Sequence, residues 1–327
     1  MSIPMKQLAP LFALLILLPL ALPLNTNAKG KPVIFDTDWW TDVDDVLALR
    51  LLLRAEREKQ VKLLGICIDA VNPWSAISVE RFCLYEGRRN VRIGIDFQAT
   101  DYNGKPPYQQ LLATEGPRGR IERNEDCEDC VSFYRKLLAQ SKEKVDIISV
   151  GYLNALSRLL NSRGDGISPL TGRELVRRKV RKLWVMGGTY PEGRENNFCR
   201  TERSIKAARH VCRDWPTKIT FLGYETGIQV KIGGSLKYEQ NGKDLAYRAL
   251  VAHGSSKGRY AWDPMLTEMA CRGEKKAGYE LTRGTTEVDE RGANTFKAHR
   301  KGRHAYVTMK QKAEEFCQQL EQRLHRP

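Results

Sequence analysis

Residues 33–49 read Val-Ile-Phe-Asp-Thr-Asp-Trp-Trp-Thr-Asp-Val-Asp-Asp-Val-Leu-Ala-Leu. The opening Val-Ile-Phe is apolar and rich in β-formers, as in a buried strand, whereas the part from Asp44 onward favours a helix. A strand followed after a short turn by a helix is the first half of a βαβ unit. This stretch therefore predicts an α/β protein.

The same alternation continues along the chain. Further strands are expected at 63–68, 91–95, 145–150, 183–186 and 219–222, with late strands at 279–281 and 305–308. Helices are expected at 44–57, 76–88, 132–142, 153–160, 204–212 and 244–252, with a closing helix at 311–324. This order predicts an open, mostly parallel sheet flanked by helices, with a Rossmann-like core. No linker or repeat divides residues 29–327, so we expect one domain there.

Residues 1–28 have the features of a signal peptide. Lys6 gives a weakly positive start, residues 11–22 are apolar, and Thr26-Asn27-Ala28 supplies small residues before Lys29. The apolar run is interrupted by prolines and is shorter than the ~20 residues of a membrane-spanning helix. We therefore expect a secreted or periplasmic protein without a stable membrane anchor.

The formal net charge is +15, and it is spread over the chain. Lys and Arg alternate with acidic residues, as in residues 54–59, and no recognised nucleic-acid motif accompanies them. We expect a basic surface and no nucleic-acid partner.

Eight cysteines in an exported chain permit disulfides, but their pairing is left open. Cys127 and Cys130 form the one closely spaced pair, which is half of a zinc-site spacing without a second half. We expect a local disulfide between them, with two free thiols as the alternative.

Polar residues follow several of the expected strands. They are Asp36, Asp38, Asp44, Asp45, Asp69, Asn72, Gly151, Gly187, Gly188, Glu195 and Asn197. Ligands of open parallel sheets bind beyond the carboxyl ends of the strands, where these segments converge. The convergence predicts a functional site at that edge.

Five carboxylates between Asp36 and Asp45 would repel one another without a counter-charge. Such oxygen-rich clusters suit calcium, which takes about six to eight oxygen ligands. Helix capping is the alternative, because Thr41-x-x-Asp44 resembles a capping box. Capping does not account for Asp36 and Asp38, so we favour a metal site.

These motifs resemble the inosine-uridine preferring nucleoside hydrolases, whose opening motif is a strand, Asp-x-Asp, a short loop and Asp-Asp leading into a helix. The likeness covers nearly the whole chain after residue 28 and continues in order at 69–72, 149–154, 185–190, 195–197, 262–264 and 284–289. The resemblance implies a single-domain hydrolase of nucleosides or related ribosides, whose oligomeric state is left open.

The resemblance also implies roles for individual residues. Calcium would be held by Asp38, Asp45, Asp263 and the Val150 carbonyl, with Asp44 as general base and Asp36 supporting the cluster. The substrate would contact Asn72, Met186, Glu195, Asn197 and Trp262. Simpler roles compete: Asn72 shapes a turn, Met186 belongs to the core, and Asp263 begins a helix or turn.

The implied reaction is hydrolysis of an N-glycosidic bond through an oxocarbenium-like transition state. Asp44, about 100° around the helix from Asp45, would deprotonate water while Asp45 binds the metal.

Two departures from the family pattern concern the aglycone. Trp39-Trp40 replaces the usual Pro-Gly or Ile-Gly, and Trp262-Asp263 replaces a His-Asp pair, so the imidazole that protonates the leaving group is absent. We expect Trp262, together with Trp39 and Trp40, to offer aromatic faces to the aglycone. His253, His299 and His304 match no family position, and we expect them at the surface.

Two other functions remain open. One is a non-catalytic receptor that uses the calcium site to bind a ribosyl or other sugar ligand. The other is a phosphohydrolase, because Asp-x-Asp also follows a strand in haloacid-dehalogenase-like enzymes. The paired Asp44-Asp45 and the missing downstream Lys motif argue against the phosphohydrolase.

Overall fold

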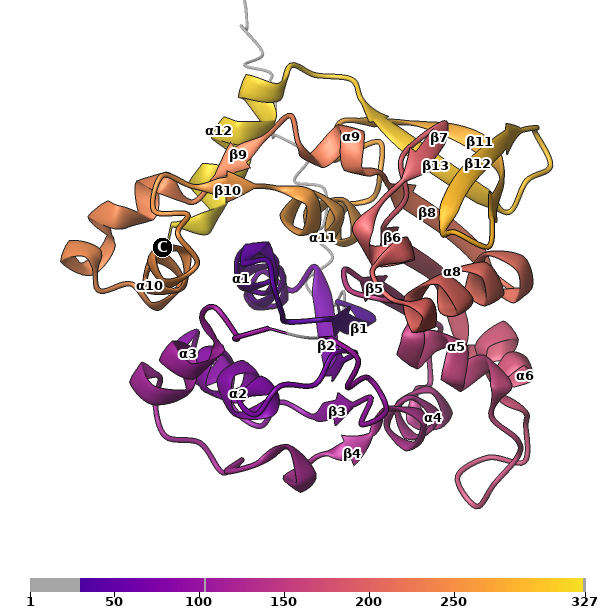
Figure 1. Cartoon of the computed structure of the whole chain (residues 1–327), viewed down its shortest axis with the longest axis horizontal. Helices are drawn as coiled ribbons and strands as arrows, with labels where there is room; N and C mark the ends of the chain where they lie inside the picture. Colours follow the sequence, from indigo (N-terminus) through magenta and orange to yellow (C-terminus); the bar gives the residue numbers. More distant parts are fainter. Residues whose placement is uncertain (1–29, 103, 326–327) are drawn as a thin grey trace, which may run out of the picture.

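A computed structural model describes residues 30–102 and 104–325, which form a central sheet covered by helices on both faces (Figure 1). The expected signal peptide, residues 1–28, lies outside the described residues. No helix in the described ranges combines the length and the apolar character needed to cross a bilayer.

The main sheet of the described chain has eleven strands in the order β4-β3-β2-β1-β5-β6-β8-β13-β11-β12-β7. Their bounds are β1 Lys31–Thr37, β2 Val61–Ile68, β3 Ile93–Ile95, β4 Glu128–Asp129, β5 Val145–Ser149, β6 Val180–Met186, β7 Glu192–Arg194, β8 Lys218–Leu222, β11 Tyr279–Val288, β12 Ala293–Ala298 and β13 His304–Met309. Pairing is parallel from β4 to β13 and antiparallel through β11, β12 and β7. Two short strands, β9 (Lys231–Ile232) and β10 (Arg259–Tyr260), pair separately.

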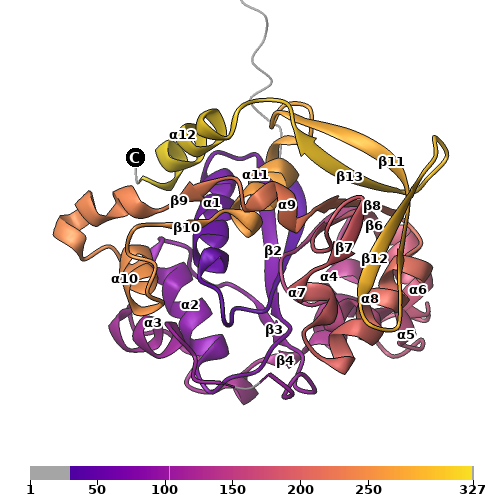
Figure 2. The ribbon, with the colours of Figure 1, turned by 45° about the horizontal axis from the view of Figure 1, so that its top comes forward.

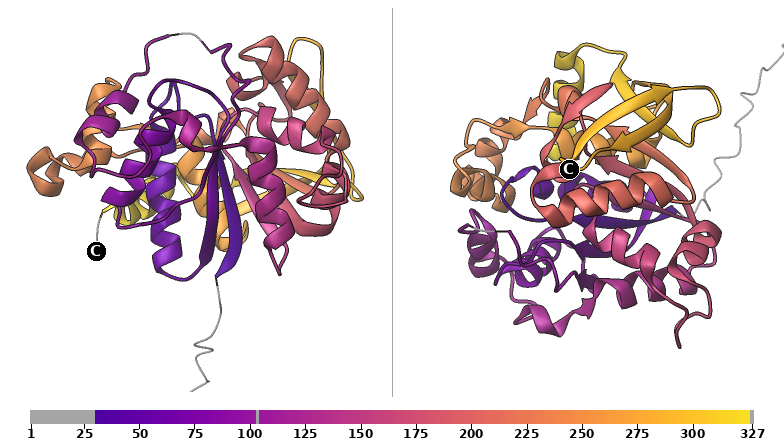
Figure 3. Two further views of the ribbon diagram at one scale, coloured as in Figure 1. Left: turned by 90° about the horizontal axis from the view of Figure 1, so that it is seen from below. Right: turned by 45° about the vertical axis from the view of Figure 1, so that its right-hand side comes forward.

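Helices connect most of these strands. Their bounds are α1 Asp44–Arg57, α2 Ser75–Tyr85, α3 Gln109–Glu115, η1 Asn124–Asp126, α4 Cys130–Gln140, α5 Asn154–Asn161, α6 Gly172–Lys179, α7 Asn196–Cys199, α8 Glu202–Asp214, α9 Tyr224–Gly227, η2 Gly234–Gly242, α10 Leu245–Ala252, α11 Trp262–Arg272 and α12 Ala313–Leu324. One large apolar cluster joins the sheet to α1, α2, α10, α11 and α12, and a second joins its other face to α4, α5, α6 and α8. The left view of Figure 3 shows helices on both sides of the indigo strands.

The register of the central strands aligns their carboxyl ends. Asp36 of β1 lies opposite Cys67 of β2 on one side and Ser149 of β5 on the other. The residues that follow these strands therefore meet at one edge of the sheet, as expected for a doubly flanked parallel sheet. The mostly parallel α/β architecture predicted from the sequence is confirmed.

Helix α11 was not among the predicted helices. Every residue from Trp262 to Cys271 is buried, so the segment has no alternation between an apolar and a polar face. It packs beside α1 and against the central strands β5, β6 and β8 (Figure 2). The antiparallel strand β12 was also missed, because its sequence ANTFKA is polar and largely exposed.

Two expectations about single residues are wrong. Cys127 and Cys130 are free thiols: Cys127 packs against the first apolar cluster and Cys130 lies within the second, with β4 between them. His304 is buried, not at the surface, and its Nδ1 accepts a hydrogen bond of 3.0 Å from the Thr286 amide.

Candidate active site

A cavity of about 390 Å³ opens at the carboxyl edge of the central strands. Its lining comes from the loop after β1, the starts of α1, α7, α9, α11 and β10, and the ends of β5 and β6. The lining residues are Asp38, Thr41, Asp42, Asp44, Asp45, Val150, Met186, Glu195, Asn196, Asn197, Tyr224, Arg259, Trp262 and Asp263. Most of the residues singled out in the sequence thus meet in one place.

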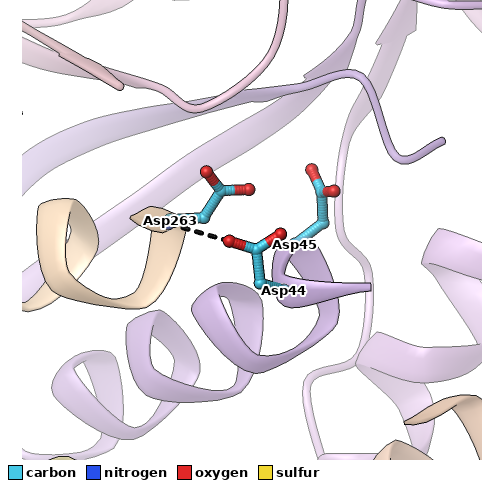
Figure 4. A group of neighbouring side chains, drawn as sticks. All are labelled: Asp44, Asp45 and Asp263. Atoms are coloured by element: carbon cyan, nitrogen blue, oxygen red, sulfur yellow. Dashed lines mark hydrogen bonds between the residues drawn. The ribbon is translucent and has the colours of Figure 1, made fainter. Parts of the chain in front are cut away.

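Three carboxylates converge where two helices begin. Asp44 and Asp45 occupy the first turn of α1, and Asp263 occupies the first turn of α11 (Figure 4). One oxygen of each lies within 4.8 Å of the others, and Asp44 Oδ2 accepts a 3.1 Å hydrogen bond from the Asp263 amide. Helix N-termini carry partial positive charge, which favours carboxylates there.

Asp38 lines the same cavity but belongs to the preceding loop. Its Oδ1 accepts a 3.0 Å hydrogen bond from the Trp40 amide. The three carboxylates that lie close together are therefore Asp45 and Asp263, which are expected calcium ligands, and Asp44, which is expected to be the general base. We call Asp38, Asp44, Asp45 and Asp263 the floor of the cavity.

The floor is buried and electrostatically unbalanced. The exposed fractions of Asp38, Asp44, Asp45 and Asp263 are 6%, 2%, 1% and 5%. Burial raises the pKa of all four carboxyls well above the usual value, and repulsion from neighbouring carboxylates raises it further. Hard oxygen donors held this close fit a divalent cation such as calcium, which would remove the repulsion.

Asn197 ties the floor to the wall of the cavity. Its Nδ2 donates to the carbonyls of Val150 at 2.9 Å and of Met186 at 3.2 Å. Glu195 accepts from the amides of Asn197 at 2.7 Å and Gly188 at 3.0 Å. Because it is buried, the pKa of Glu195 is raised to about 7.

The backbone behind the floor has no room for another side chain. A Cβ on Gly151 would collide with the backbone nitrogen of Asp38 and with the Asp69 carboxyl. This glycine therefore lets the strand end after β5 approach the loop after β1.

Asp36 and Asn72 do not line the cavity. Asp36 accepts 2.7 Å hydrogen bonds from the Tyr134 and Ser149 hydroxyls, and burial raises its pKa to about 6. The Oδ1 of Asn72 accepts from the Trp74 amide at 2.9 Å, which shapes the turn before α2.

Helix capping does not explain the aspartates. The N-cap of α1 is Val43, which makes no side-chain cap, and Thr41 does not bond to the first turn. Asp42 instead accepts from the Val43 amide at 2.7 Å and forms an ion pair with Arg259.

Trp39 and Trp40 face away from the cavity, so the expectation that they offer aromatic faces to a ligand is wrong. Trp39 is fully buried, and its Nε1 donates to the Ser78 hydroxyl at 2.9 Å. Trp40 packs in a separate small cluster with Ala70, Ala99, Tyr102 and Tyr152. Both rings fill space because the loop after β1 turns them inward.

The open side of the cavity carries aromatic rings and one cation. Trp262 stacks on Tyr224 with ring centres 5.4 Å apart, and its Nε1 donates to the Tyr224 carbonyl at 2.9 Å. Tyr224 is 42% exposed. Arg259 lies over the Trp262 ring at 5.2 Å. We call Tyr224, Arg259 and Trp262 the rim.

Sequence reasoning missed several lining residues, namely Thr41, Asp42 in this role, Asn196, Tyr224 and Arg259. Arg259 belongs to a strand of two residues, too short to leave a pattern. Its place three residues before Trp262-Asp263 was the one available signal.

No family model matches this chain, and no curated protein matches it by sequence. Solved structures match it by fold. A plant nucleoside hydrolase aligns with a TM-score of 0.69 and 15% identity over 91% of this chain and 100% of that one. The inosine-uridine preferring nucleoside hydrolase of Bacillus anthracis aligns with a TM-score of 0.66 and 16% identity over 90% of this chain and 99% of that one. The purine-preferring ribonucleoside hydrolase of Gardnerella vaginalis aligns with a TM-score of 0.66 and 17% identity over 90% of this chain and 98% of that one. The chain has the nucleoside hydrolase fold.

Proposed function

We propose that this protein is a calcium-dependent hydrolase of the N-glycosidic bond in ribonucleosides or related ribosides. The observation that carries the proposal is the group of four buried carboxylates on the floor of a cavity, within a nucleoside hydrolase fold. Relatives in fold are named for this chemistry, and the cavity here has room for a small sugar ligand.

The proposed calcium ligands are Asp38, Asp45, Asp263 and the Val150 carbonyl. All four line the cavity, and the carbonyl keeps a lone pair beyond the one used by Asn197. Calcium, when bound, would hold the ribose hydroxyls and lower the pKa of a bound water. Asp36 lies in β1, two residues before Asp38, and its proposed role is to hold the end of this strand in place.

The remaining residues act on substrate and water. Asp44 is the proposed general base, since its Oδ2 is oriented by the Asp263 amide. Glu195 and Asn197 are placed to bind ribose hydroxyls, with Met186 packing against the sugar and Trp262 against the aglycone. Asn72 lies outside the lining, and the proposal gives it no contact with the sugar.

In the proposed reaction a water oxygen bonds to C1′ as the bond from C1′ to the aglycone breaks. The electron pair of that bond leaves with the aglycone, and Asp44 takes the proton of the water. Negative charge around the ring stabilises the oxocarbenium-like transition state. The products are ribose and the aglycone, which receives its proton from solvent.

We also propose that the protein is exported, because residues 1–28 have the features of a signal peptide. The secreted or periplasmic protein should begin near Lys29. N-terminal sequencing of the protein recovered from outside the cytoplasm tests this point, and an intact Met1 would contradict it.

Release of free ribose from a panel of purine and pyrimidine nucleosides tests the activity, measured with calcium and with excess chelator. We expect calcium-dependent ribose release. Ligand binding without ribose release would indicate a sugar-binding receptor instead, and phosphate release from a phosphorylated panel would indicate a phosphohydrolase.

A further inference from the structure

The cavity is electrically polarised. Among the described residues that line it, six carry carboxyl groups and Arg259 is the only cation. The floor carboxylates are at most 6% exposed, whereas the Arg259 side chain is 29% exposed and Tyr224 42%. Five of the six carboxyls therefore lie at the closed end, whereas Arg259 lies at the open end, paired with the partly exposed Asp42.

Arg259 is held in a fixed orientation. Its Nε donates to Asp42 Oδ1 at 2.8 Å, and its Nη2 donates to Asp42 Oδ2 at 2.6 Å. Such a bidentate pair fixes the plane of the guanidinium. The Nη1 group makes no hydrogen bond to another described residue, so two N–H donors remain for a ligand.

The neighbouring tryptophan supplies no such donor. The indole N–H of Trp262 is already bonded to the Tyr224 carbonyl, so this side chain can offer only its ring face. Among the described lining residues, the hydroxyls of Thr41 and Tyr224 and the exposed Asn196 amide are further side-chain donors. None of them is charged, and a charged donor stabilises an anion more strongly.

We propose that Arg259 binds the departing aglycone and stabilises the negative charge that develops on it. This inference rests on the proposed function and supplies the group that replaces the missing imidazole. Breaking the bond between C1′ and the aglycone puts positive charge on the sugar and negative charge on the leaving group. The floor carboxylates face the positive charge on the sugar, and Arg259 faces the negative charge on the aglycone.

Arg259 acts without transferring a proton. Hydrogen bonds to Asp42 raise the pKa of the guanidinium, which stays protonated throughout. The electron pair of the broken bond stays on the aglycone, which departs as an anion hydrogen-bonded to Nη1 and is protonated by solvent. A guanidinium has donors and no acceptors, so the favoured aglycone presents an acceptor edge to the rim.

The test uses a series of substituted phenyl ribosides whose phenols differ in pKa, with kcat/KM measured for the wild type and for Arg259→Gln. We expect the variant to lose about 10²- to 10³-fold for the poorest leaving group and under about 10-fold for p-nitrophenol. The plot of log kcat/KM against leaving-group pKa should therefore steepen. Lys257→Gln removes the same charge from an exposed neighbouring position and should keep the wild-type slope.

Two further variants separate a direct role from a structural one. Asp42→Asn keeps Arg259 but loosens it, so poor leaving groups should again slow more than p-nitrophenol, by a smaller factor than in Arg259→Gln. Equal losses for every leaving group in Arg259→Gln would show that Arg259 only holds the loop after β1, and would overturn the inference. Steepening by Tyr224→Phe alone would assign the role to that hydroxyl. If the wild type releases ribose from no member of the series or of the nucleoside panel, the proposed function fails instead.

Discussion

The floor and the rim belong to one cavity but are built in different ways. The floor carboxylates stand at the ends of long buried elements, β1, α1 and α11, and solvent barely reaches them. The rim comes from the four-residue helix α9, the two-residue strand β10 and the first residue of α11, and Tyr224 is the most exposed of its side chains. Position is fixed by packing at the floor and by side-chain pairs at the rim.

This difference separates two tasks. A buried group of like charges costs stability unless a cation joins it, so the floor is suited to hold a metal and a base at set positions. The rim stacks rings and directs one guanidinium, contacts suited to the proposed binding of the aglycone. We therefore expect changes to the floor to abolish turnover and changes to the rim to alter which substrates are turned over.

The largest expected effect is at the floor. Asp44→Asn keeps the shape of the side chain but cannot accept a proton from water at neutral pH, so kcat should fall by about 10²- to 10⁴-fold. Steady-state release of ribose measures this. Binding of a non-hydrolysable ribose analogue should persist and serves as the control. A variant with the wild-type rate would place the base elsewhere.

A smaller effect concerns metal and pH. Calcium should raise the melting temperature, because a ligand that binds only the folded state raises the free energy of unfolding by about 2.7 kcal/mol when its concentration is 100 times its dissociation constant. Without metal, the pKa values of the floor carboxyls are higher in the folded state than in the unfolded state. Their contribution to the free energy of unfolding is therefore fully present below the ordinary carboxyl pKa, and it is lost as pH rises through the higher folded-state pKa values.

The gain from calcium should therefore be larger at pH 8 than at pH 5.5, because ligation needs deprotonated carboxylates. Melting curves at both pH values, with calcium or chelator, measure this. A melting temperature that is independent of calcium at both values would contradict a metal site on the floor.

The floor was largely predictable from sequence and the rim was not. Asp38, Asp44 and Asp45 stand in one dense motif at a strand end, where both charge and position are visible in the chain. Asp263 required the family resemblance, because α11 is buried all round and shows no helical periodicity.

Arg259 and Tyr224 acquire their meaning only through contacts over long sequence distances, such as the ion pair between Arg259 and Asp42. The inward turn of Trp39 was also invisible, since its φ of 47° belongs to a region that non-glycine residues rarely occupy. Two adjacent large rings favoured a ligand contact, but the tertiary fold placed both in the protein interior.

The smallest expected effect compares two tryptophans in these different settings. Trp262→Leu keeps an apolar group against α9 but removes the ring face, and stacking on an aromatic ring is worth roughly 1–3 kcal/mol per base. We expect KM for a nucleoside to rise about tenfold, with a small change in kcat and an unchanged pH profile. Trp39→Phe is the matched control: it loses the hydrogen bond to Ser78 and about 1 kcal/mol of stability, yet should leave KM unchanged because its ring faces the core. Steady-state kinetics and melting temperatures of both variants make the comparison. An equal rise of KM in the two variants would mean that Trp262 acts through packing, and that the rim does not contact the aglycone by its ring.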